Sequence, residues 1–155
     1  MERQDIENFL YREARLLDEH NYDGWESLWT DDGVYWVPCN EDDNDPLLHV
    51  SIIYDDRAAL RRRLDRLSSG AAWAQEPKSR MRRITSNIET ENGSAGDVTV
   101  YSNFNLSEYR SGVQTTWVGR AVHRLRDENG TVKMSYKKVM LINNDAELPI
   151  LVFLI

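Results

Sequence analysis

The chain opens with a hydrophobic pattern of helical period. Apolar side chains recur at spacings of three and four residues on one face, at Ile6, Phe9, Leu10, Leu16 and Leu17. This spacing predicts an amphipathic helix that ends near Asn21. A second short helical stretch is predicted over 22–29. A third helix is predicted over 56–68, with leucines on one side, arginines on the other, and Asp55 or Asp56 as its N-terminal cap.

From residue 82 onward the hydrophobic period changes to two, which is typical of strands buried on one face. Turn residues separate the alternating runs, at Glu91-Asn92-Gly93, Ser111-Gly112 and Asn129-Gly130. These breaks predict successive hairpins and hence a mostly antiparallel sheet. An earlier strand is predicted over 34–38, closed by proline. In the last strand the apolar phase moves from even to odd positions, which predicts a β-bulge near Lys137–Lys138.

Helices followed by a run of long hairpins predict an α+β fold, with the N-terminal helices packed on a curved, mostly antiparallel sheet. A sheet curved over the first helix would form a cone. We expect one domain over 1–155, because a chain of 155 residues that is 41% hydrophobic and 29% charged can bury a core of its own. The formal charge of −7 disfavours nucleic acid as a partner.

The N-terminus has neither the basic nor the apolar region of a secretory signal, so a cytoplasmic location is expected. The longest apolar stretch, 148–155, is too short to cross a bilayer and predicts no membrane association. A monomer would rarely leave such a segment in water. We therefore expect it to be buried between subunits, so that removal of the residues after Asn144 would weaken assembly more than folding.

Charge is distributed unevenly along the chain. Residues 1–56 hold 3 basic and 16 acidic side chains, whereas residues 57–83 hold 9 basic and 2 acidic ones. The basic block could bind phosphate groups, but no glycine-rich phosphate loop accompanies it. The favoured interpretation is that it pairs with the acidic N-terminal part or with a partner subunit. Its members are Arg57, Arg61, Arg62, Arg63, Arg66, Lys78, Arg80, Arg82 and Arg83.

Few residues form a recognisable chemical site. The histidines at 20, 49 and 123 are far apart in sequence and match no local metal motif. Cys39 follows a proline at a strand end and is interpreted as a structural thiol. The acidic loop lacks the central glycine and terminal glutamate of an EF-hand, so it is interpreted as solvated; its acids are Glu41, Asp42, Asp43 and Asp45.

Glu13 is the one unusual residue, because it projects onto the apolar face of the first helix, as His20 does. A carboxylate on such a face must be paired or protonated. One interpretation makes Glu13 a general acid or base with a raised pKa, supported by His20 or by a tyrosine such as Tyr54 or Tyr101. The favoured one is structural, with Glu13 held by an arginine of the 57–83 block or by a tyrosine hydroxyl.

Four stretches carry a family resemblance: FLYREARLLDE at 9–19, YWVP at 35–38, IYDDRAALRRRLDRL at 53–67 and RRITSNI at 82–88. Together they resemble the small (beta) subunit of aromatic-ring-hydroxylating dioxygenases. Their order and spacing match that family from near the N-terminus through the last strand. The resemblance implies a cystatin-like, nuclear-transport-factor-2-like cone, in agreement with the order of elements predicted above.

The resemblance also implies a hetero-oligomer, commonly of three large (alpha) and three small subunits. The large subunit would carry a Rieske 2Fe–2S cluster, a mononuclear iron and the substrate pocket. A reductase, often with a ferredoxin, would deliver electrons from NADH or NADPH. The complex would add both atoms of O2 to an aromatic ring to give a cis-dihydrodiol, a step of aromatic hydrocarbon catabolism. The small subunit would be structural, associate as a trimer, and hold no cofactor.

The cysteine count agrees with this division, since a Rieske centre needs two cysteines and Cys39 is alone. No catalytic, cofactor-binding or metal-binding residue is therefore assigned to this chain. A second hypothesis stays open, because the same fold hosts enzymes. It is a stand-alone dehydratase or isomerase that uses cavity residues such as Glu13, Tyr54, Asp55 or His49.

Overall fold

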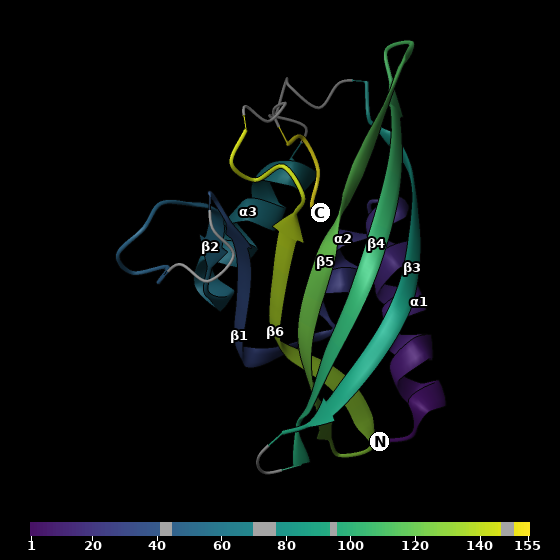
Figure 1. Ribbon diagram of the computed structural model, residues 1–155, viewed down its shortest axis with the longest axis vertical. Helices are drawn as coiled ribbons and strands as arrows, with labels where there is room; N and C mark the ends of the chain where they lie inside the picture. The colour runs from purple at the N-terminus through teal and green to yellow at the C-terminus, as the bar shows by residue number, and fades with distance from the viewer. Residues whose placement is uncertain (41–44, 70–76, 94–95, 147–150) are drawn as a thin grey trace.

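The computed structural model describes residues 1–40, 45–69, 77–93, 96–146 and 151–155, and it shows a curved sheet with helices on its concave side (Figure 1). The helices are α1 (Arg3–Asp18), α2 (Tyr22–Glu26) and α3 (Arg57–Ser68). The strands are β1 (Trp29–Pro38), β2 (Ser51–Asp55), β3 (Arg80–Asn92), β4 (Val98–Arg110), β5 (Val113–Glu128) and β6 (Thr131–Leu141). This arrangement confirms the predicted α+β fold.

Helix α1 ends three residues earlier than predicted. His20 adopts a left-handed conformation, with φ of 54°, and the Asn21 amide donates a 2.9 Å hydrogen bond back to the Leu16 carbonyl. This wrapping satisfies a carbonyl of the last turn and directs the chain into α2. His20 thus lies beyond the helix and does not share the apolar face with Glu13. At α3 the predicted cap is confirmed, since the Asp56 carboxylate accepts a 2.8 Å hydrogen bond from the Ala59 amide.

The strands form one six-stranded sheet of order β2-β1-β6-β5-β4-β3. Only the β1–β6 pair is parallel, and the other pairs are antiparallel, as the predicted hairpins require. At two hairpins the turn residues have positive φ, as type I′ turns demand; they are Ser111, Gly112, Asn129 and Gly130. The sequence-predicted turns at these points are therefore confirmed.

Two predicted positions in the sheet need correction. Strand β1 begins at Trp29 rather than Val34, because Trp29 already pairs with Met134 across the parallel ladder. The predicted second helix is accordingly shorter and ends at Glu26. The β6 register shifts between Met134 and Tyr136, which leaves Ser135 as the extra residue of a bulge. The bulge therefore exists, but it lies two residues before the predicted Lys137–Lys138 position.

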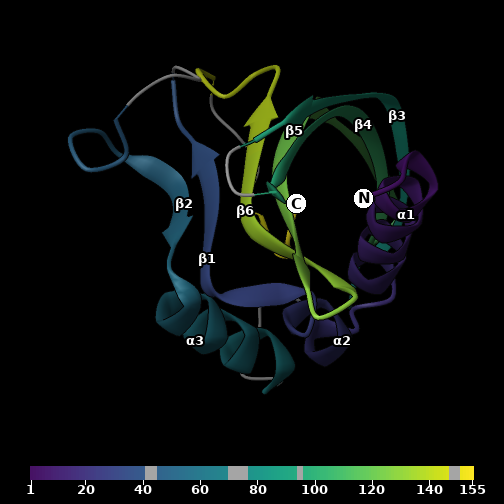
Figure 2. The same cartoon turned by 90° about the horizontal axis from the view of Figure 1, so that it is seen from below.

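The core lies between the concave face of the sheet and the helices. Figure 2, a view along the long axis, shows the sheet curving from β1 round to β3, with α1 beside β3 and α3 beside β1 and β2. Helix α1 contributes the side chains that the helical pattern predicts, namely Ile6, Phe9, Leu10, Leu16 and Leu17. No helix among the described residues is long and apolar enough to span a membrane.

The described part of the apolar C-terminal segment, residues 151–155, lies in or against this core, which corrects the prediction that the segment is buried between subunits. Phe153, Leu154 and Ile155 are each no more than 3% exposed. The Phe153 ring packs edge-on against Trp117 at a centroid distance of 5.8 Å. The Tyr35 hydroxyl donates a 2.6 Å hydrogen bond to the Ile155 carbonyl. These side chains belong to the same core cluster as the apolar face of α1.

Substitution of Phe153 by alanine should therefore destabilise the isolated chain by about 3–5 kcal/mol, the usual cost of emptying a buried phenylalanine site. Urea denaturation followed by tryptophan fluorescence measures this directly. Leu151→Ala is the matched control, since Leu151 is only half-buried and its loss should cost less. An unchanged unfolding midpoint for Phe153→Ala, with assembly lost instead, would restore the original prediction for the tail.

Candidate functional site

The strongest candidate site inside the cone surrounds Glu13, whose side chain is only 7% exposed. Its Oε1 accepts hydrogen bonds from Lys137 Nζ at 2.6 Å and from Trp25 Nε1 at 3.0 Å. Its Oε2 lies 3.4 Å from Nε2 of His123. Three elements, α2, β5 and β6, thus supply polar partners to one carboxylate of α1.

The partner of Glu13 is a lysine, which neither sequence interpretation anticipates. It is not an arginine of the 57–83 block or a tyrosine hydroxyl. The even-numbered apolar phase of early β6 would direct Lys137 away from the core, but the bulge at Ser135 turns it inward. The ammonium group also lies 5.9 Å from the Trp25 ring centroid and 5.8 Å from that of Tyr35. The phase change in the sequence is the one signal that could have located it.

The pKa of Glu13 is the reverse of what a general acid needs. Burial by itself raises the pKa of the carboxyl group, but attraction to Lys137 and to His123 outweighs burial and lowers the pKa below its ordinary value of 4.5. Glu13 is therefore ionised at neutral pH. Ionised and bound at Oε1 by Lys137 and Trp25, the carboxylate does not hold the proton that a general acid must donate.

The cavity beside this cluster is too small for an organic substrate. It measures about 30 Å³, and its polar lining residues are Glu13, Arg83, Thr85, Ser102, His123 and Lys137. Small-molecule sites usually occupy about 300–1,000 Å³. The Ile155 side chain forms part of its wall, so the C-terminal segment takes up room that an open cone would offer. The space suits about one water molecule, which could serve His123 Nδ1, a buried atom with no hydrogen-bond partner among the described residues.

The other proposed cavity residues do not join this cluster. Tyr54 is exposed on the outer side of the sheet, and the Tyr101 hydroxyl donates to Glu91 at 3.0 Å. His49 is exposed on the turn before β2, whereas Asp55 pairs with an arginine of α3. His20 contacts the Tyr22 hydroxyl at 3.0 Å and the Ser79 carbonyl at 2.8 Å. The set proposed for a stand-alone enzyme is thus dispersed.

The basic block pairs with the acidic N-terminal part of the same chain, as the favoured interpretation predicts. Glu26 is bound by Arg57 at 3.2 Å and by Arg61 at 2.9 Å, and the Asp55–Arg63 pair spans 2.5 Å. These contacts fix α3 against the segments before it. In addition, Arg83 joins the end of α1 to the C-terminal segment through the Asp18 carboxylate and the Leu154 carbonyl.

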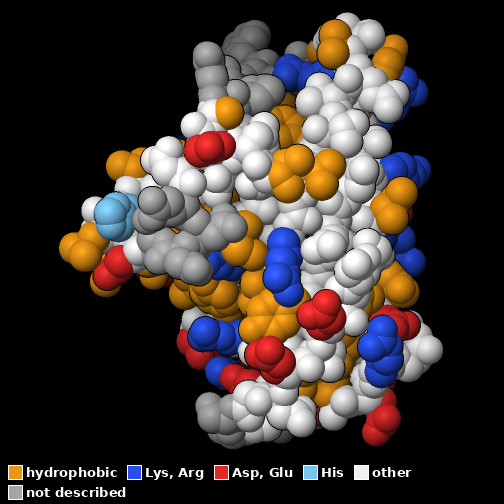
Figure 3. All heavy atoms as spheres, in the orientation of Figure 1, with side chains coloured by type: hydrophobic (Ala, Val, Ile, Leu, Met, Phe, Trp, Pro, Cys, Tyr) orange, Lys and Arg blue, Asp and Glu red, His pale blue; other side chains and the backbone are white. Residues whose placement is uncertain are grey.

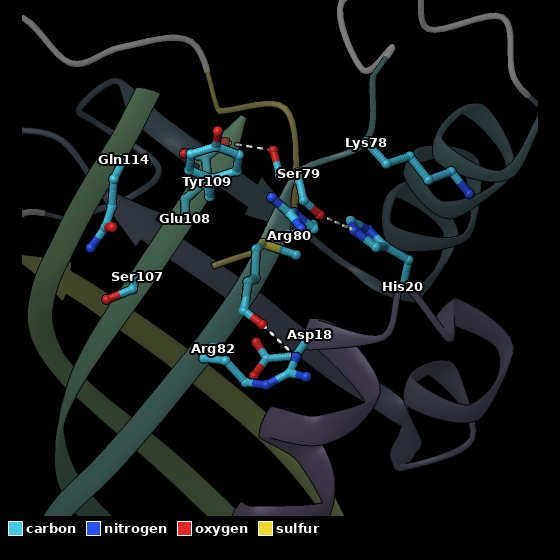
Figure 4. Close-up of a pocket in the computed structure, with 11 residues that line it drawn as sticks. Asp18, His20, Lys78, Ser79, Arg80, Arg82, Ser107, Glu108, Tyr109 and Gln114 are labelled. Atoms are coloured by element: carbon cyan, nitrogen blue, oxygen red, sulfur yellow. Dashed lines mark hydrogen bonds between the residues drawn. The ribbon is translucent and has the colours of Figure 1, made fainter. Parts of the chain in front are cut away.

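A hollow of about 590 Å³ lies at the start of β3 and is open to solvent (Figure 4). Its buried acid is Glu108, which sequence reasoning did not single out, although alternation along β4 places it on the inner face. Glu108 accepts hydrogen bonds from Ser79 Oγ at 2.5 Å and from Trp117 Nε1 at 3.1 Å. Arg80 stacks over the Tyr109 ring at 4.7 Å. These side chains contact one another and do not point together at a common position where a ligand could bind.

The thiol of Cys39 belongs to no metal site among the described residues. Cys39 is half-buried, and its Sγ lies 3.7 Å from the Asn144 carbonyl. Residues 41–44 of the acidic loop lie outside the described residues. Within the described ranges, no three histidine, cysteine or acidic side chains are placed to hold a metal ion.

Comparison with known proteins gives a consistent result. The 2-halobenzoate 1,2-dioxygenase small subunit of Burkholderia cepacia is 31% identical over 90% of this chain and 88% of its own length. The p-cumate 2,3-dioxygenase small oxygenase component of Pseudomonas putida is 33% identical over 90% of this chain and 78% of its own. The beta subunit of benzoate 1,2-dioxygenase from Burkholderia mallei superposes with a TM-score of 0.83 at 28% identity, covering 99% and 98% of the two chains.

The sequence model of the ring hydroxylating beta subunit family matches residues 12–146, which include α1 from its middle, the whole sheet and the residues around Glu13. Relatives and solved structure agree with it in fold and in extent. The chain therefore belongs to the ring hydroxylating beta subunit family, the small subunits of aromatic-ring dioxygenases.

Proposed function

We propose that this chain is a non-catalytic, structural subunit of its dioxygenase, and that the chemistry takes place on a large (alpha) subunit. The observation that carries the proposal is the interior of the cone. The Glu13 carboxylate is ionised and held by Lys137, and the space beside this pair is about 30 Å³. A stand-alone dehydratase or isomerase would need an open cavity with a free acid or base.

The complex would oxidise an aromatic ring, and an aromatic carboxylate is the substrate class that the relatives favour. Their names give 2-halobenzoate, p-cumate and benzoate as substrates. The reaction consumes one aromatic molecule, O2, NAD(P)H and a proton, and it yields a cis-dihydrodiol and NAD(P)+. Turnover of benzoate against benzene by the complex assembled with its large subunit would test this substrate class.

The two iron centres of such a complex would belong to the large subunit, because the residues of this chain do not fit them. A Rieske cluster requires two cysteines and two histidines, and Cys39 is the single cysteine. A mononuclear iron needs two histidines and a carboxylate together. His123 is enclosed beside an ion pair, while His20 and His49 lie elsewhere on the fold.

The chain purified alone should accordingly hold no stoichiometric iron. Incubation with ferrous iron under anaerobic conditions, followed by desalting and metal analysis, should leave far less than one iron per chain. The large subunit treated in the same way is the positive control. Retention of one iron per small subunit would assign a metal role to this chain and contradict the proposal.

Disruption of the Glu13–Lys137 pair should lower the stability of the fold and leave the turnover of the assembled complex unchanged. Glu13→Gln leaves Lys137 as an uncompensated buried charge and should destabilise the fold by about 3–5 kcal/mol. The double variant Glu13→Gln/Lys137→Met removes that charge and should recover much of the loss, a strong departure from additivity. Denaturant unfolding of the single and double variants measures both effects.

Glu7→Gln is the matched control, since its 2.8 Å pair with Arg3 lies on the surface of the same helix and should matter little. Turnover of the complex assembled from folded Glu13→Gln protein should stay within about twofold of the wild type. A hundredfold loss of turnover with assembly intact would make Glu13 a catalytic residue. Each tenfold loss of rate corresponds to about 1.4 kcal/mol of activation free energy.

The small subunit would associate with itself as a trimer and with three large subunits. Support comes from the outer face of β5 and β6, where Val118, Val122 and Met140 are only half-buried and Ile142 is 76% exposed. Such a face is unusual for a monomer. Light scattering of the full-length chain should show a mass near three times the 18.1 kDa of one copy. A stable monomer at micromolar concentration, with or without the large subunit, would contradict this assembly.

A further inference from the structure

The turn before β2 displays a group of apolar side chains in solvent. Leu47, Leu48 and Val50 are 81%, 78% and 80% exposed. Figures 1 and 2 both show this stretch projecting from the body of the molecule beside β2. Single exposed apolar residues are common, but three on one projection form a contiguous patch of the kind that marks an interaction site.

Hydrogen bonds within the turn set its backbone conformation. The Asp45 carboxylate accepts a 2.9 Å hydrogen bond from the Leu47 amide. The Asp45 carbonyl accepts hydrogen bonds from the amides of Leu48 at 3.0 Å and His49 at 2.9 Å. Because the backbone conformation is already set, little ordering would oppose binding of the leucines to a complementary surface.

A recess of matching character lies on the outer face of the sheet. It measures about 540 Å³, and its apolar wall comes from Tyr101, Val118, Val122, Met140 and Ile142. Figure 3 views this face and shows apolar side chains interspersed with charged side chains of both signs. The volume is large enough for two or three aliphatic side chains. The turn of the same chain does not fill it, since the three apolar side chains of that turn remain exposed.

The charges around the two features are complementary. Arg120 lines the recess and stacks over the Tyr101 ring at 5.0 Å, and Arg124 stacks over the Tyr136 ring at 4.8 Å. Glu89, 3.8 Å from Arg120, and Glu91, which accepts a 3.0 Å hydrogen bond from the Tyr101 hydroxyl, offset part of this charge. The turn instead begins with an acidic residue, Asp45. An apolar projection that begins with a carboxylate is therefore complementary to an apolar recess that is lined by an arginine and a lysine.

We propose that the 45–50 turn of one copy seats in the outer-sheet recess of a second copy of this chain. The contact is heterologous, since projection and recess are different surfaces, and a threefold rotation between successive copies closes such contacts into a ring of three. The inference rests on the proposed self-association and identifies the surfaces that produce it. A second copy is the occupant because the complementary charge and shape both occur on this chain.

Two variants, Leu48→Glu and Val122→Glu, test the contact from its two sides. Each alters an exposed or half-buried side chain, so the fold should survive, and circular dichroism checks this. Each variant alone should lose the threefold mass and become monomeric. A 1:1 mixture should form a heterodimer, because Val122→Glu keeps an intact turn and Leu48→Glu keeps an intact recess. Val113→Glu, at an apolar residue 64% exposed at the β4–β5 turn, should remain trimeric.

Cysteine cross-linking locates the contact independently. In a Cys39→Ser background, Leu48→Cys with Val122→Cys should oxidise to covalent dimers and trimers, whereas Leu48→Cys with Asn129→Cys should not. A wild-type trimer unaffected by both glutamate variants would overturn this contact and leave the assembly proposal standing. A wild-type monomer would instead contradict the assembly itself. Loss of large-subunit binding by Leu48→Glu, with the small-subunit trimer intact, would also overturn the proposal, because it makes the large subunit the occupant.

Discussion

The buried ion pair between Glu13 and Lys137 is the interaction on which the interior of this protein depends. It joins α1 to β6 across 124 residues of sequence, and neither charge could remain in the core without the other. The bulge at Ser135 is a condition of the pair, since without the extra residue Lys137 would face the opposite side of the sheet. Helix position, strand register and core electrostatics are therefore linked.

The C-terminal residues 151–155 lie beside this pair, since Ile155 lines the same small cavity. Tyr35 and Arg83 bind two of their backbone carbonyl groups. Arg83 also holds Asp18 at the end of α1, with a 2.9 Å hydrogen bond from its backbone amide. The end of α1, the C-terminal residues and the buried pair are therefore connected in one interior.

The sequence predicted those parts of the structure that local chemistry determines. The apolar spacing located α1, and Asp56 located the start of α3 as its cap. The dipeptides Ser-Gly and Asn-Gly located two hairpins, where the structure shows the positive φ angles of tight turns. Strand β2 was not predicted, because five residues at a sheet edge carry little periodicity. The apolar octapeptide was placed wrongly, since hydrophobicity shows that a segment is buried but not which chain buries it.

The candidate site shows the same division. Burial of Glu13 followed from its helical face, whereas the identity of its partner did not. Lys137 comes from a strand whose side-chain direction depends on one inserted residue, and alternation alone would exclude it. Glu108 was within reach of alternation along β4, but a carboxylate among leucine, tyrosine and serine gives no local indication that Trp117 and Ser79 will satisfy it.

Two groups of arginines can be distinguished in this chain, those paired with acidic residues and those stacked on aromatic rings of the outer sheet. Arg57, Arg61, Arg63 and Arg83 are neutralised within the chain by acids of the N-terminal part. On the outer sheet, by contrast, Arg124 rests on a tyrosine ring and has no acidic partner among the described residues. Stacking orders a guanidinium group without cancelling its charge. Arg124 thus keeps its positive charge in an ordered position on the outer sheet, whereas the arginines paired within the chain do not.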